Sequence, residues 1–505
     1  MTEGPGAHTC RHSTVRQRAV VSTCLAVVSV ACNEIDRRHT NHPGVLLRLG
    51  VAQLVATSPV SGIRQIARNL VLEGLVRPDI DGRMQPLLAE TWRTSQDSRI
   101  TTIKLRPKVR FHDGSRLDAR TVAALLPDIM RSFMGPLFRE IERVKAIDDD
   151  LVEIGFHQAS LFLTEALEVQ LHNAGQELDG TGPFVAVPAQ PGATTRIQRN
   201  NDYYLDQPEI TAVDVRSFGS VRTAWAELLR GNLDVLYEVG PEAAELMKQT
   251  RTISLFTFTR PYQHVILLNP RVPSLRSAKI RSALNVAIDR KALVKSALNE
   301  YGVPSVGPVW PQHWALDTNL PRFEYEPDQA VRVLRARTVP PVHFTCLVSP
   351  DPLDERIALE VKRQLAAVGV DMNLDQQTRD EILRRAATLQ YEGVLGEAIS
   401  GPTLFRSYLA WDSNGPLNWG HVGSQAIDSA FNQLVRASSD DKYREAISEL
   451  HRSFLNDPPA IFLAWSVRAR AVSRRFAVPP AEPGRDILST LRLWKPVEHT
   501  QAPRN

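Results

Sequence analysis

Residues that could line a pocket for a small solute gather in two stretches of the sequence. Residues 395–405 (LGEAISGPTLF) combine a carboxylate, a hydroxyl and a proline, and tryptophans follow shortly after. Residues 260–264 (RPYQH) combine aromatic and polar side chains. Aromatic walls with a few polar groups are typical of a solute pocket. The binding-site candidates are Tyr262, Gln263, His264, Glu397, Ala398, Ser400, Trp411 and Trp419.

Several candidates also have a purely structural explanation. Trp411 and Trp419 are large apolar side chains that could equally be plugs of a hydrophobic core. His264 could be a satisfied histidine between two packed parts of the chain. The sequence leaves both alternatives open for each of these residues.

Familiar enzyme motifs are missing from the sequence. It contains no G-x-S-x-G, H-E-x-x-H, phosphate-binding loop or G-x-G-x-x-G pattern. His112 and Asp113 are neighbours on a predicted turn, which favours a scaffold role over a catalytic pair. Asp380 and Glu381 follow Thr378 with the spacing of a helix cap. We therefore expect no enzyme, no catalytic residue, no cofactor and no bound metal.

Composition indicates a globular protein with more than one lobe. The chain has 505 residues, of which 43% are hydrophobic and 23% charged, too long for one ordinary core. The formal net charge is only +4, and basic and acidic residues are interspersed. Nucleic-acid binding is therefore not expected.

The first residues have the composition of an export signal. Arg16 and Arg18 precede a mostly apolar run at 19–31, which is too short to span a membrane as a helix. Cys32 follows directly and resembles the lipidated cysteine of bacterial lipoproteins, although Ser29 stands where that motif prefers Leu. We expect export and a lipid on Cys32; the alternative is a buried apolar strand. Cys346 would remain as a free, buried strand cysteine.

Strand-like and helical patterns alternate along the chain, which predicts an α/β protein. The expected strands are residues 101–105, 151–156 and 370–374. The expected helices are residues 222–230, 279–298 and 354–368. No Pro- or Gly-rich stretch is long enough to be a free linker, so the lobes should pack together.

A series of sequence blocks follows one order along most of the chain. The first block is LAETW at 88–92 with LRPKVRFHDGSRLDARTV at 105–122, and the second is GTGPF at 180–184 with RNNDYY at 199–204. The third is LRGNLDV at 229–235, and the fourth is Asn269 with RSALNVAIDR at 281–290. The fifth is AID at 426–428 with PPAI at 458–461. In these blocks the chain resembles the peptide, nickel and opine binding proteins of ABC importers, extracellular solute-binding protein family 5. Each block is weak alone, and their shared order carries the resemblance.

The resemblance implies a two-lobed α/β clamp of the periplasmic-binding-protein type II fold, with an extra α/β domain inserted in the first lobe. Such a clamp closes because the solute contacts both lobes only in the closed state. The expected parts are an export signal at 1–31, a lipid-anchored tether at 32–45, lobe I at 46–70, 179–262 and 470–498, the inserted domain at 71–178, and lobe II at 263–469.

The resemblance also implies a function and partners. We expect an exported lipoprotein of the cell membrane, facing the periplasm or the extracellular side, that delivers a peptide or similar solute to the permease subunits of an ABC importer. It is expected to be a monomer. A regulatory or interaction lipoprotein that keeps the clamp without transport is the alternative, and a secreted hydrolase is a distant third.

One departure from the family bears on the solute. In its peptide binders an Asp of the second lobe pairs with the peptide's amino group, and that position is Ala398 here. The family's acidic residue before the proline is Gly401, and its earlier aromatic residue is Leu395. Glu397 could substitute only through a backbone shift, because neighbours in a strand point to opposite faces. Either Glu397 binds the amine or the solute lacks an ammonium group, and we favour the second.

Overall fold

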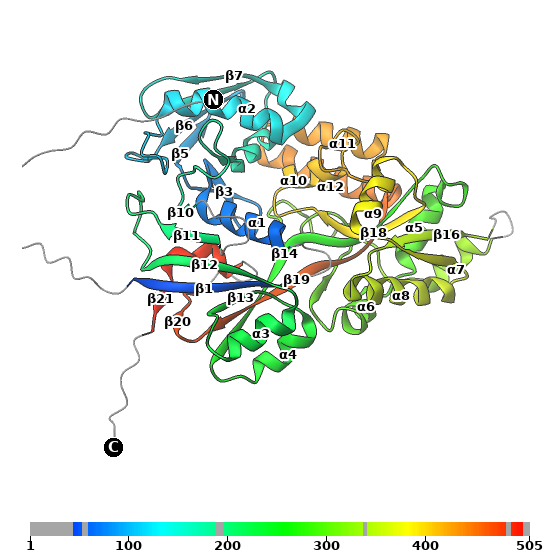
Figure 1. Cartoon of the computed structure of the whole chain (residues 1–505). Coiled ribbons are helices and arrows are strands. Elements are labelled where there is room, and N and C mark those ends of the chain that lie inside the picture. Colours follow the sequence, from blue (N-terminus) through cyan, green and yellow to red (C-terminus); the bar gives the residue numbers. More distant parts are fainter. Residues whose placement is uncertain (1–43, 53–58, 188–194, 337–340, 481–485, 498–505) are drawn as a thin grey trace, which may run out of the picture. The chain divides into compact units, whose positions relative to one another are not determined.

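The computed structural model describes residues 44–52, 59–187, 195–336, 341–480 and 486–497 (Figure 1). All of them lie in one unit that begins at Gly44. The export signal and Cys32 lie outside the described residues.

An 11-stranded sheet runs through this unit. In spatial order its strands are β10 (Phe184–Ala186), β11 (Thr195–Arg199), β12 (Ile210–Phe218), β1 (Val45–Ala52), β13 (Val235–Val239), β19 (Ala460–Ser473), β14 (Ile253–Leu268), β18 (Gly393–Ile399), β16 (His343–Val348) and β17 (Asp371–Gln376), and β15 (Gly302–Pro304) pairs with β19. β1 is parallel to β12 and β13, and β16 is parallel to β17 and β18. The long antiparallel pair β14 and β19 lies between these two groups and joins them.

Helices cover the faces of this sheet (Figure 1). Beside the first group lie α1 (Pro59–Val71), α3 (Val221–Leu229), α4 (Pro241–Lys248) and the 3-10 helix η4 (Ile487–Leu493). The second group carries η3 (Pro273–Leu275), α5 (Ala278–Val286), α6 (Arg290–Ser296), α7 (Pro327–Leu334), α8 (Pro352–Ala367), α9 (Arg379–Ala387), α10 (Leu404–Trp411), α11 (Gln425–Val435) and α12 (Asp440–Asn456). Mixed α/β architecture was predicted from the sequence and is confirmed.

A separate four-stranded antiparallel sheet is formed within residues 71–178. Its order is β5 (Ala89–Thr94), β6 (Ile100–Leu105), β8 (Leu151–Phe156) and β7 (Ile141–Ala146), and α2 (Ala119–Met134) packs on it. The 3-10 helices η1 (Gly135–Glu140) and η2 (Phe162–Glu168) follow α2 and β8. Two-stranded pairs complete the fold: β2 (Glu73–Gly74) with β9 (Gln170–Leu171), β3 (Val76–Pro78) with β4 (Met84–Pro86), and β20 (Phe476–Ala477) with β21 (Lys495–Pro496).

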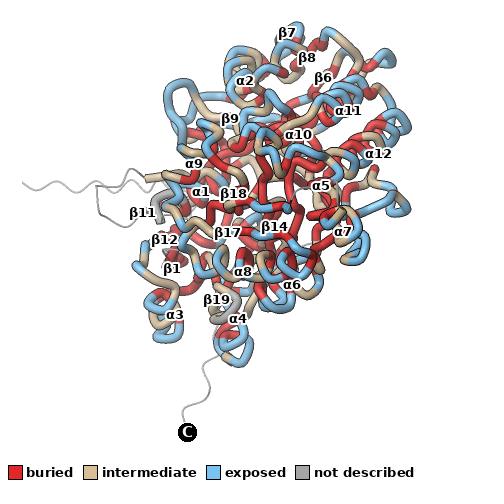
Figure 2. The backbone as a smooth tube through the Cα atoms, turned by 90° about the vertical axis from the view of Figure 1, so that its right-hand side faces the viewer, coloured by how far each residue is buried: buried red, intermediate tan, exposed pale blue. Residues whose placement is uncertain are grey.

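The largest apolar core is shared between the four-stranded sheet and α10–α12. Phe162 of η2 meets Phe405 of α10 with ring centroids 5.4 Å apart. A second core lies under α5, α6 and α8 on the other face of β14 and β18. Buried residues therefore concentrate along the central strands and α10, while outer helices such as α3, α4 and α11 present exposed faces (Figure 2).

One predicted helix is wrong in its length. The expected helix at 279–298 is two helices, α5 and α6, with a break between Val286 and Arg290. The break occurs because Asp289 adopts an extended conformation and its side chain caps α6, accepting from the backbone N–H of Ala292 at 2.9 Å. Periodicity alone did not reveal this internal cap.

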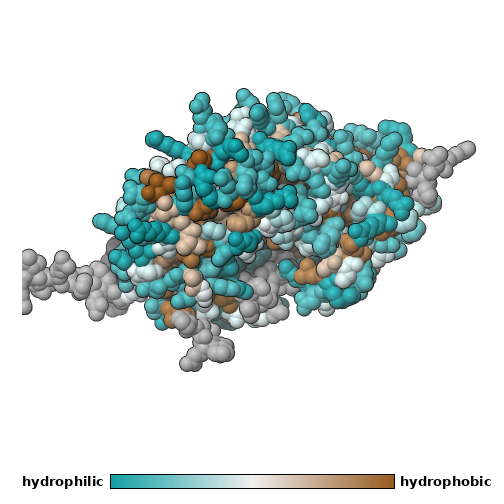
Figure 3. Space-filling view, turned by 90° about the horizontal axis from the view of Figure 1, so that it is seen from above, coloured by the Kyte–Doolittle hydropathy of each residue, from teal (hydrophilic) through white to brown (hydrophobic). Residues whose placement is uncertain are grey.

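The visible face of the molecule is mostly hydrophilic, with small scattered hydrophobic patches (Figure 3). None of the described helices is both long and apolar enough to cross a membrane.

Candidate functional site

The carboxyl ends of β13 and β18 meet at one group of charged residues. Parallel strands of α/β sheets place ligands beyond their carboxyl ends, so this is the position at which a solute site is expected. β13 belongs to the first strand group and β18 to the second, and β14 and β19 run between them. We call the group the charged cluster; its members are Glu238, Arg260, His264, Glu397 and Arg468.

Ion pairs connect the charged cluster across four strands. Arg468 on β19 lies with its Nε 2.7 Å from Oε1 of Glu238, and its Nη2 donates to Oε1 of Glu397 at 3.0 Å. Arg260 on β14 donates from Nη1 to Oε2 of Glu397 at 3.2 Å. The Arg260 guanidinium also lies over the ring of Tyr262, 4.3 Å from its centroid. Both oxygens of Glu397 are therefore already paired with guanidinium groups.

One buried polar side chain beside this carboxylate has no hydrogen-bond partner among the described residues. His264 is 2% exposed, and neither ring nitrogen has a hydrogen-bond partner among the described residues. Its Nε2 lies 3.6 Å from Oε1 of Glu397. The hydroxyl of Ser466 on β19 is buried beside Glu397 and helps to lower the pKa of that carboxyl. Burial, aided by the two arginines, lowers the pKa of His264 to about 4, so its ring is neutral at physiological pH.

Electrostatics hold Glu397 ionised. Burial would raise the pKa of this carboxyl, but Arg468, Arg260 and His264 outweigh burial and lower the pKa below its usual range. Burial likewise opposes the charge of Arg260, yet the nearby Glu397 and Glu238 carboxylates raise the pKa of its guanidinium. With His264 neutral, two carboxylates and two guanidiniums give the charged cluster no net charge.

A further carboxyl lies at the start of α8, within electrostatic reach of Glu397. Burial, together with the Asp351 and Glu397 carboxylates, raises the pKa of Asp354 to about 6, although a hydrogen bond from Ser349 opposes the shift. Its Oδ2 accepts from the Ser349 hydroxyl at 2.6 Å.

Ala398 faces away from the charged cluster. In the β14–β18 register, Glu397 is opposite His264 and Ala398 is opposite Gln263. Ala398 is 5% exposed and belongs to the core shared with α10–α12. Gln263 is fully buried and donates from Nε2 to the carbonyl of Gly307 at 3.1 Å. The expectation that neighbouring side chains of this strand serve opposite faces is confirmed.

Ser400 and Trp411 lie together in the core. The Trp411 indole is 1% exposed, packs against Phe454 and Phe462, and donates from Nε1 to the Ser400 hydroxyl at 2.7 Å. The Ser400 carbonyl accepts from Ser407 at 2.9 Å. These contacts favour the structural alternative for Trp411.

Trp419 and Tyr262 are the partly exposed aromatic candidates. A Cβ at position 396 would meet the Trp419 ring at 3.2 Å, so Gly396 allows the indole to lie close over β18. Tyr262 lies under Arg260, as described above. The structure thus brings Tyr262, His264 and Glu397 to one face and separates them from Gln263, Ala398, Ser400 and Trp411. Two surface hollows, on α1 and on α11, include none of the candidates.

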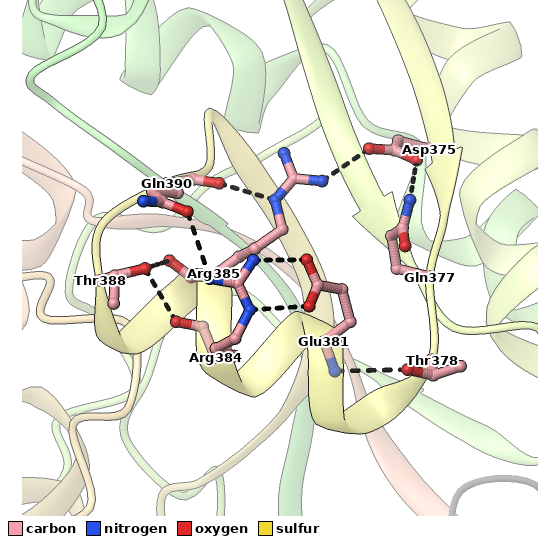
Figure 4. Close-up of polar contacts among 8 residues, drawn as sticks. All are labelled: Asp375, Gln377, Thr378, Glu381, Arg384, Arg385, Thr388 and Gln390. Carbon is pink, nitrogen blue, oxygen red and sulfur yellow. Dashed lines mark hydrogen bonds and ion pairs between the residues drawn. The ribbon is translucent and has the colours of Figure 1, made fainter.

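The features set aside as scaffold behave as predicted. The Asp113 carboxylate accepts from the backbone N–H of Ser115 at 2.8 Å in a turn where Gly114 has φ +88. Thr378 caps α9, and Glu381 forms a paired contact with Arg384 (Figure 4). Burial raises the pKa of the Cys346 thiol, which lies within β16, to about 12. No group of three or more metal-binding side chains occurs among the described residues.

Arg468 and Glu238 were missed by sequence reasoning. A signal was present, because each is a charged residue in a mostly apolar strand: Arg468, with Arg470, within Ala460–Ser473, and Glu238 within Val235–Val239. Charges in such strands are rarely buried unless they are paired. Nothing in the sequence indicated that they pair with one another.

Comparison with known proteins identifies the family. The model of bacterial extracellular solute-binding proteins, family 5, matches residues 83–411. The glutathione-binding protein GsiB of Pectobacterium atrosepticum is 27% identical over 382 residues, which cover 71% of this chain and 72% of that protein.

Two solved structures share the fold. NikZ from Campylobacter jejuni in complex with Ni(L-His) superposes with a TM-score of 0.76 at 20% identity, over 90% of this chain and 100% of that one. The oligopeptide-binding protein AppA from Bacillus subtilis in complex with a nonapeptide gives 0.72 at 18% identity, with the same coverage. These relatives are substrate-binding proteins of ABC transporters and not enzymes, in agreement with the expectation from sequence. The chain belongs to the bacterial extracellular solute-binding proteins of family 5.

Proposed function

We propose that this protein captures a peptide or peptide-like solute outside the cytoplasm and delivers it to the permease subunits of an ABC importer. The charged cluster carries this proposal. It joins β13 of one strand group to β18 of the other through Arg468, and it lies on the strands that connect the two groups. A solute bound there contacts both groups at once, so its binding energy favours a closed arrangement that a permease can recognise.

The two groups correspond to the lobes of the clamp in this proposal. Lobe I comprises residues 46–70, 179–262 and 470–498, the inserted domain comprises 71–178, and lobe II comprises 263–469. The separate sheet within 71–178 and the position of β14 and β19 between the strand groups support this division.

Relatives support a solute built from amino acids. GsiB is named for glutathione, AppA was solved with a nonapeptide and NikZ with a nickel complex of histidine. These solutes all carry carboxylate groups, and glutathione is a small peptide. Reduced glutathione is therefore the first probe for this protein, and trialanine is the second.

The proposal includes a membrane anchor. The apolar run before Cys32 supports export and attachment through a lipid on this cysteine. The mature protein is then a monomeric lipoprotein that faces away from the cytoplasm and has no role in nucleic-acid binding.

Calorimetry on the purified protein tests the proposed function. Saturable binding of reduced glutathione or trialanine at one site per chain is expected. Native mass spectrometry of protein isolated from its own host should show a retained solute of peptide-like mass. Absence of binding to either probe, together with a solute-free protein from the host, would overturn the proposal.

The replacement of the family's aspartate by Ala398 favours a second candidate, an envelope regulatory lipoprotein that keeps the clamp without transport. Neighbouring genes separate the two. Permease and ATPase genes beside this one favour transport, whereas an isolated gene among envelope-assembly genes favours regulation.

A further inference from the structure

The two arginines of the charged cluster differ in their remaining hydrogen-bonding capacity. Arg468 contacts Glu238 through Nε and Glu397 through Nη2, and its side chain is 15% exposed. Arg260 makes one hydrogen bond, from Nη1 to Glu397, and is 23% exposed. Among the described residues no acceptor is bonded to its Nε or Nη2. A guanidinium has five N–H donors in a fixed fork, so most of those of Arg260 remain available.

Tyr262 adds to this free donor surface. Its ring centroid lies 4.3 Å from Cζ of Arg260, and this cation–π contact helps to hold the guanidinium in place. The Tyr262 side chain is partly exposed, and its hydroxyl has no hydrogen-bond partner in the described part of the chain. Arg406 of α10 lies near Tyr262, but its guanidinium is paired with the Glu168 carboxylate. Its Nε donates to Oε1 at 2.9 Å and its Nη2 to Oε2 at 2.6 Å. Arg260 is thus the more weakly paired of the two arginines of the charged cluster.

Glu397, unlike Arg260, already has a hydrogen-bond partner for each of its oxygens. Its Oε1 accepts from Arg468 and its Oε2 from Arg260, and the neighbouring His264 is neutral. A solute ammonium would have to displace a guanidinium and would then stand beside two arginines. Like charges this close are unfavourable at a partly buried site.

The unpartnered ring of His264 is a second, independent sign of a ligand site. Its side chain is 2% exposed, and its Nε2 lies 3.6 Å from Oε1 of Glu397 in the charged cluster. Buried polar groups normally have partners, so such groups mark places where a ligand or ordered water completes the hydrogen bonding.

We propose that Arg260, supported by Tyr262, binds a carboxylate group of the solute, and that Glu397 is a positioning residue that orients the two guanidiniums and does not bind an ammonium group. This inference rests on the proposed function and assigns the solute class at the same site: a solute with a free carboxylate, whose amino group is dispensable. A planar guanidinium and a carboxylate form paired, charge-assisted hydrogen bonds, which supply both affinity and orientation.

Modified probes test which end of the solute is recognised. Calorimetry compares reduced glutathione with N-acetylglutathione, which lacks the ammonium, and with glutathione diethyl ester, which lacks both carboxylates. Trialanine, N-acetyltrialanine and trialanine amide form a matched second series. The acetylated probes should bind within about threefold of the parent compounds, and the ester and amide should bind about 10- to 100-fold more weakly.

Variants locate the effect on one side chain. Arg260→Gln should weaken the binding of the parent peptides by about 10- to 100-fold and leave the affinity for the ester and amide unchanged. Arg260→Lys keeps the charge beside Glu397 but lacks the fork, so it should fold like the wild type and still lose affinity. Arg363→Gln, an exposed arginine that pairs with Glu360 on α8, is the control and should bind like the wild type.

The outcomes separate this inference from the proposed function. If ester and amide bind as tightly as the parent peptides, or if acetylation abolishes binding, the proposed function stands and the carboxylate assignment is overturned. It is also overturned if Arg260→Gln and Arg260→Lys bind the parent peptides normally. If no form of either peptide binds the wild type, the proposed function for peptides fails, and this inference with it.

Discussion

Arg468 on β19 reaches across β14 to Glu397 on β18, with Nη2 and Oε1 3.0 Å apart. The two strands are not neighbours in the sheet, so their side chains meet only because both point to the same face. The same guanidinium contacts Glu238 on β13, so one arginine ties both strand groups together at the proposed solute site. These contacts give Glu397 a structural role in this sheet.

Replacing Glu397 by Gln should lower the free energy of unfolding by roughly 1–3 kcal/mol at pH 7, because Arg260 and Arg468 lose their shared counter-charge. Because the folded-state pKa of Glu397 is lowered, its contribution is present above the unfolded pKa and is lost as the pH falls toward the folded value. Urea denaturation at pH 7 and pH 4 measures both effects. Glu381→Gln is the control, since that carboxylate pairs with Arg384 on the surface and its replacement should cost much less stability. Equal effects of the two substitutions would contradict the role of the charged cluster.

Restoring the family's aspartate by Ala398→Asp should destabilise this protein. The side chain at this position faces the apolar core and is opposite Gln263, so the new carboxyl would be buried. Its folded-state pKa would be raised, and the loss of stability would therefore grow as the pH rises from 5 to 8. We expect a cost of roughly 1–3 kcal/mol at pH 7 in thermal or urea unfolding. Wild-type stability at pH 7 with a gain in affinity for free peptide amines would show instead that position 398 lines an accessible pocket.

Stability should depend on pH through Glu165. This carboxyl on η2 accepts from the Tyr443 hydroxyl and from the Phe405 backbone N–H, and burial raises its pKa to about 8. A raised folded-state pKa gives stability that is full below the unfolded value of 4.5 and is lost as the pH rises through about 8. Glu165→Gln should therefore gain stability relative to the wild type between pH 5 and pH 8, by on the order of 1 kcal/mol or more. For Glu90→Gln, which removes a carboxylate paired with Lys104 at the surface, the plot of stability against pH should run parallel to that of the wild type. A parallel plot for Glu165→Gln would refute the prediction.

Replacing Arg290 by Lys should destabilise the folded protein. It is buried, and its guanidinium donates to the carbonyls of Phe462, Asn285 and Ile288 at 2.8, 3.0 and 3.2 Å. Lysine presents a single ammonium and leaves several buried carbonyls unpaired, so Arg290→Lys should cost roughly 2–4 kcal/mol. Urea denaturation measures this loss, with the exposed Arg363→Lys as a near-neutral control. An unchanged unfolding midpoint for Arg290→Lys would mean that its hydrogen bonds do not stabilise the fold.

Replacing Cys32 by Ala should release the protein from the membrane fraction. The thiol is the expected site of the lipid, and none of the described helices is long and apolar enough to hold the protein in a membrane. Cell fractionation with an antibody against the protein measures the change, and Cys346→Ala, which alters a buried thiol, serves as the comparison. Retention of the Cys32→Ala protein through detergent-free washes would locate the anchor elsewhere.

Local pattern was sufficient for many elements of the fold. The strand expected at 151–156 is β8 (Leu151–Phe156), and the helix expected at 354–368 lies within one residue or two of α8 (Pro352–Ala367). These elements follow from periodicity, which depends on residues close in sequence. The break between α5 and α6 was missed because the cap at Asp289 lies inside a continuous apolar pattern.

By itself the sequence determined the α/β class, the family and the fact that Glu397 and Ala398 serve opposite faces, because alternation along a strand is a local property. Only the tertiary structure decided which of the two faces carries charge. Glu238, Arg260, Glu397 and Arg468 come from four strands, and their meeting depends on strand order and on the register that places Glu397 opposite His264. Ion pairs between residues so distant in the chain leave no local pattern, so the partners of Glu397, and with them the character of the site, became visible only in the folded sheet.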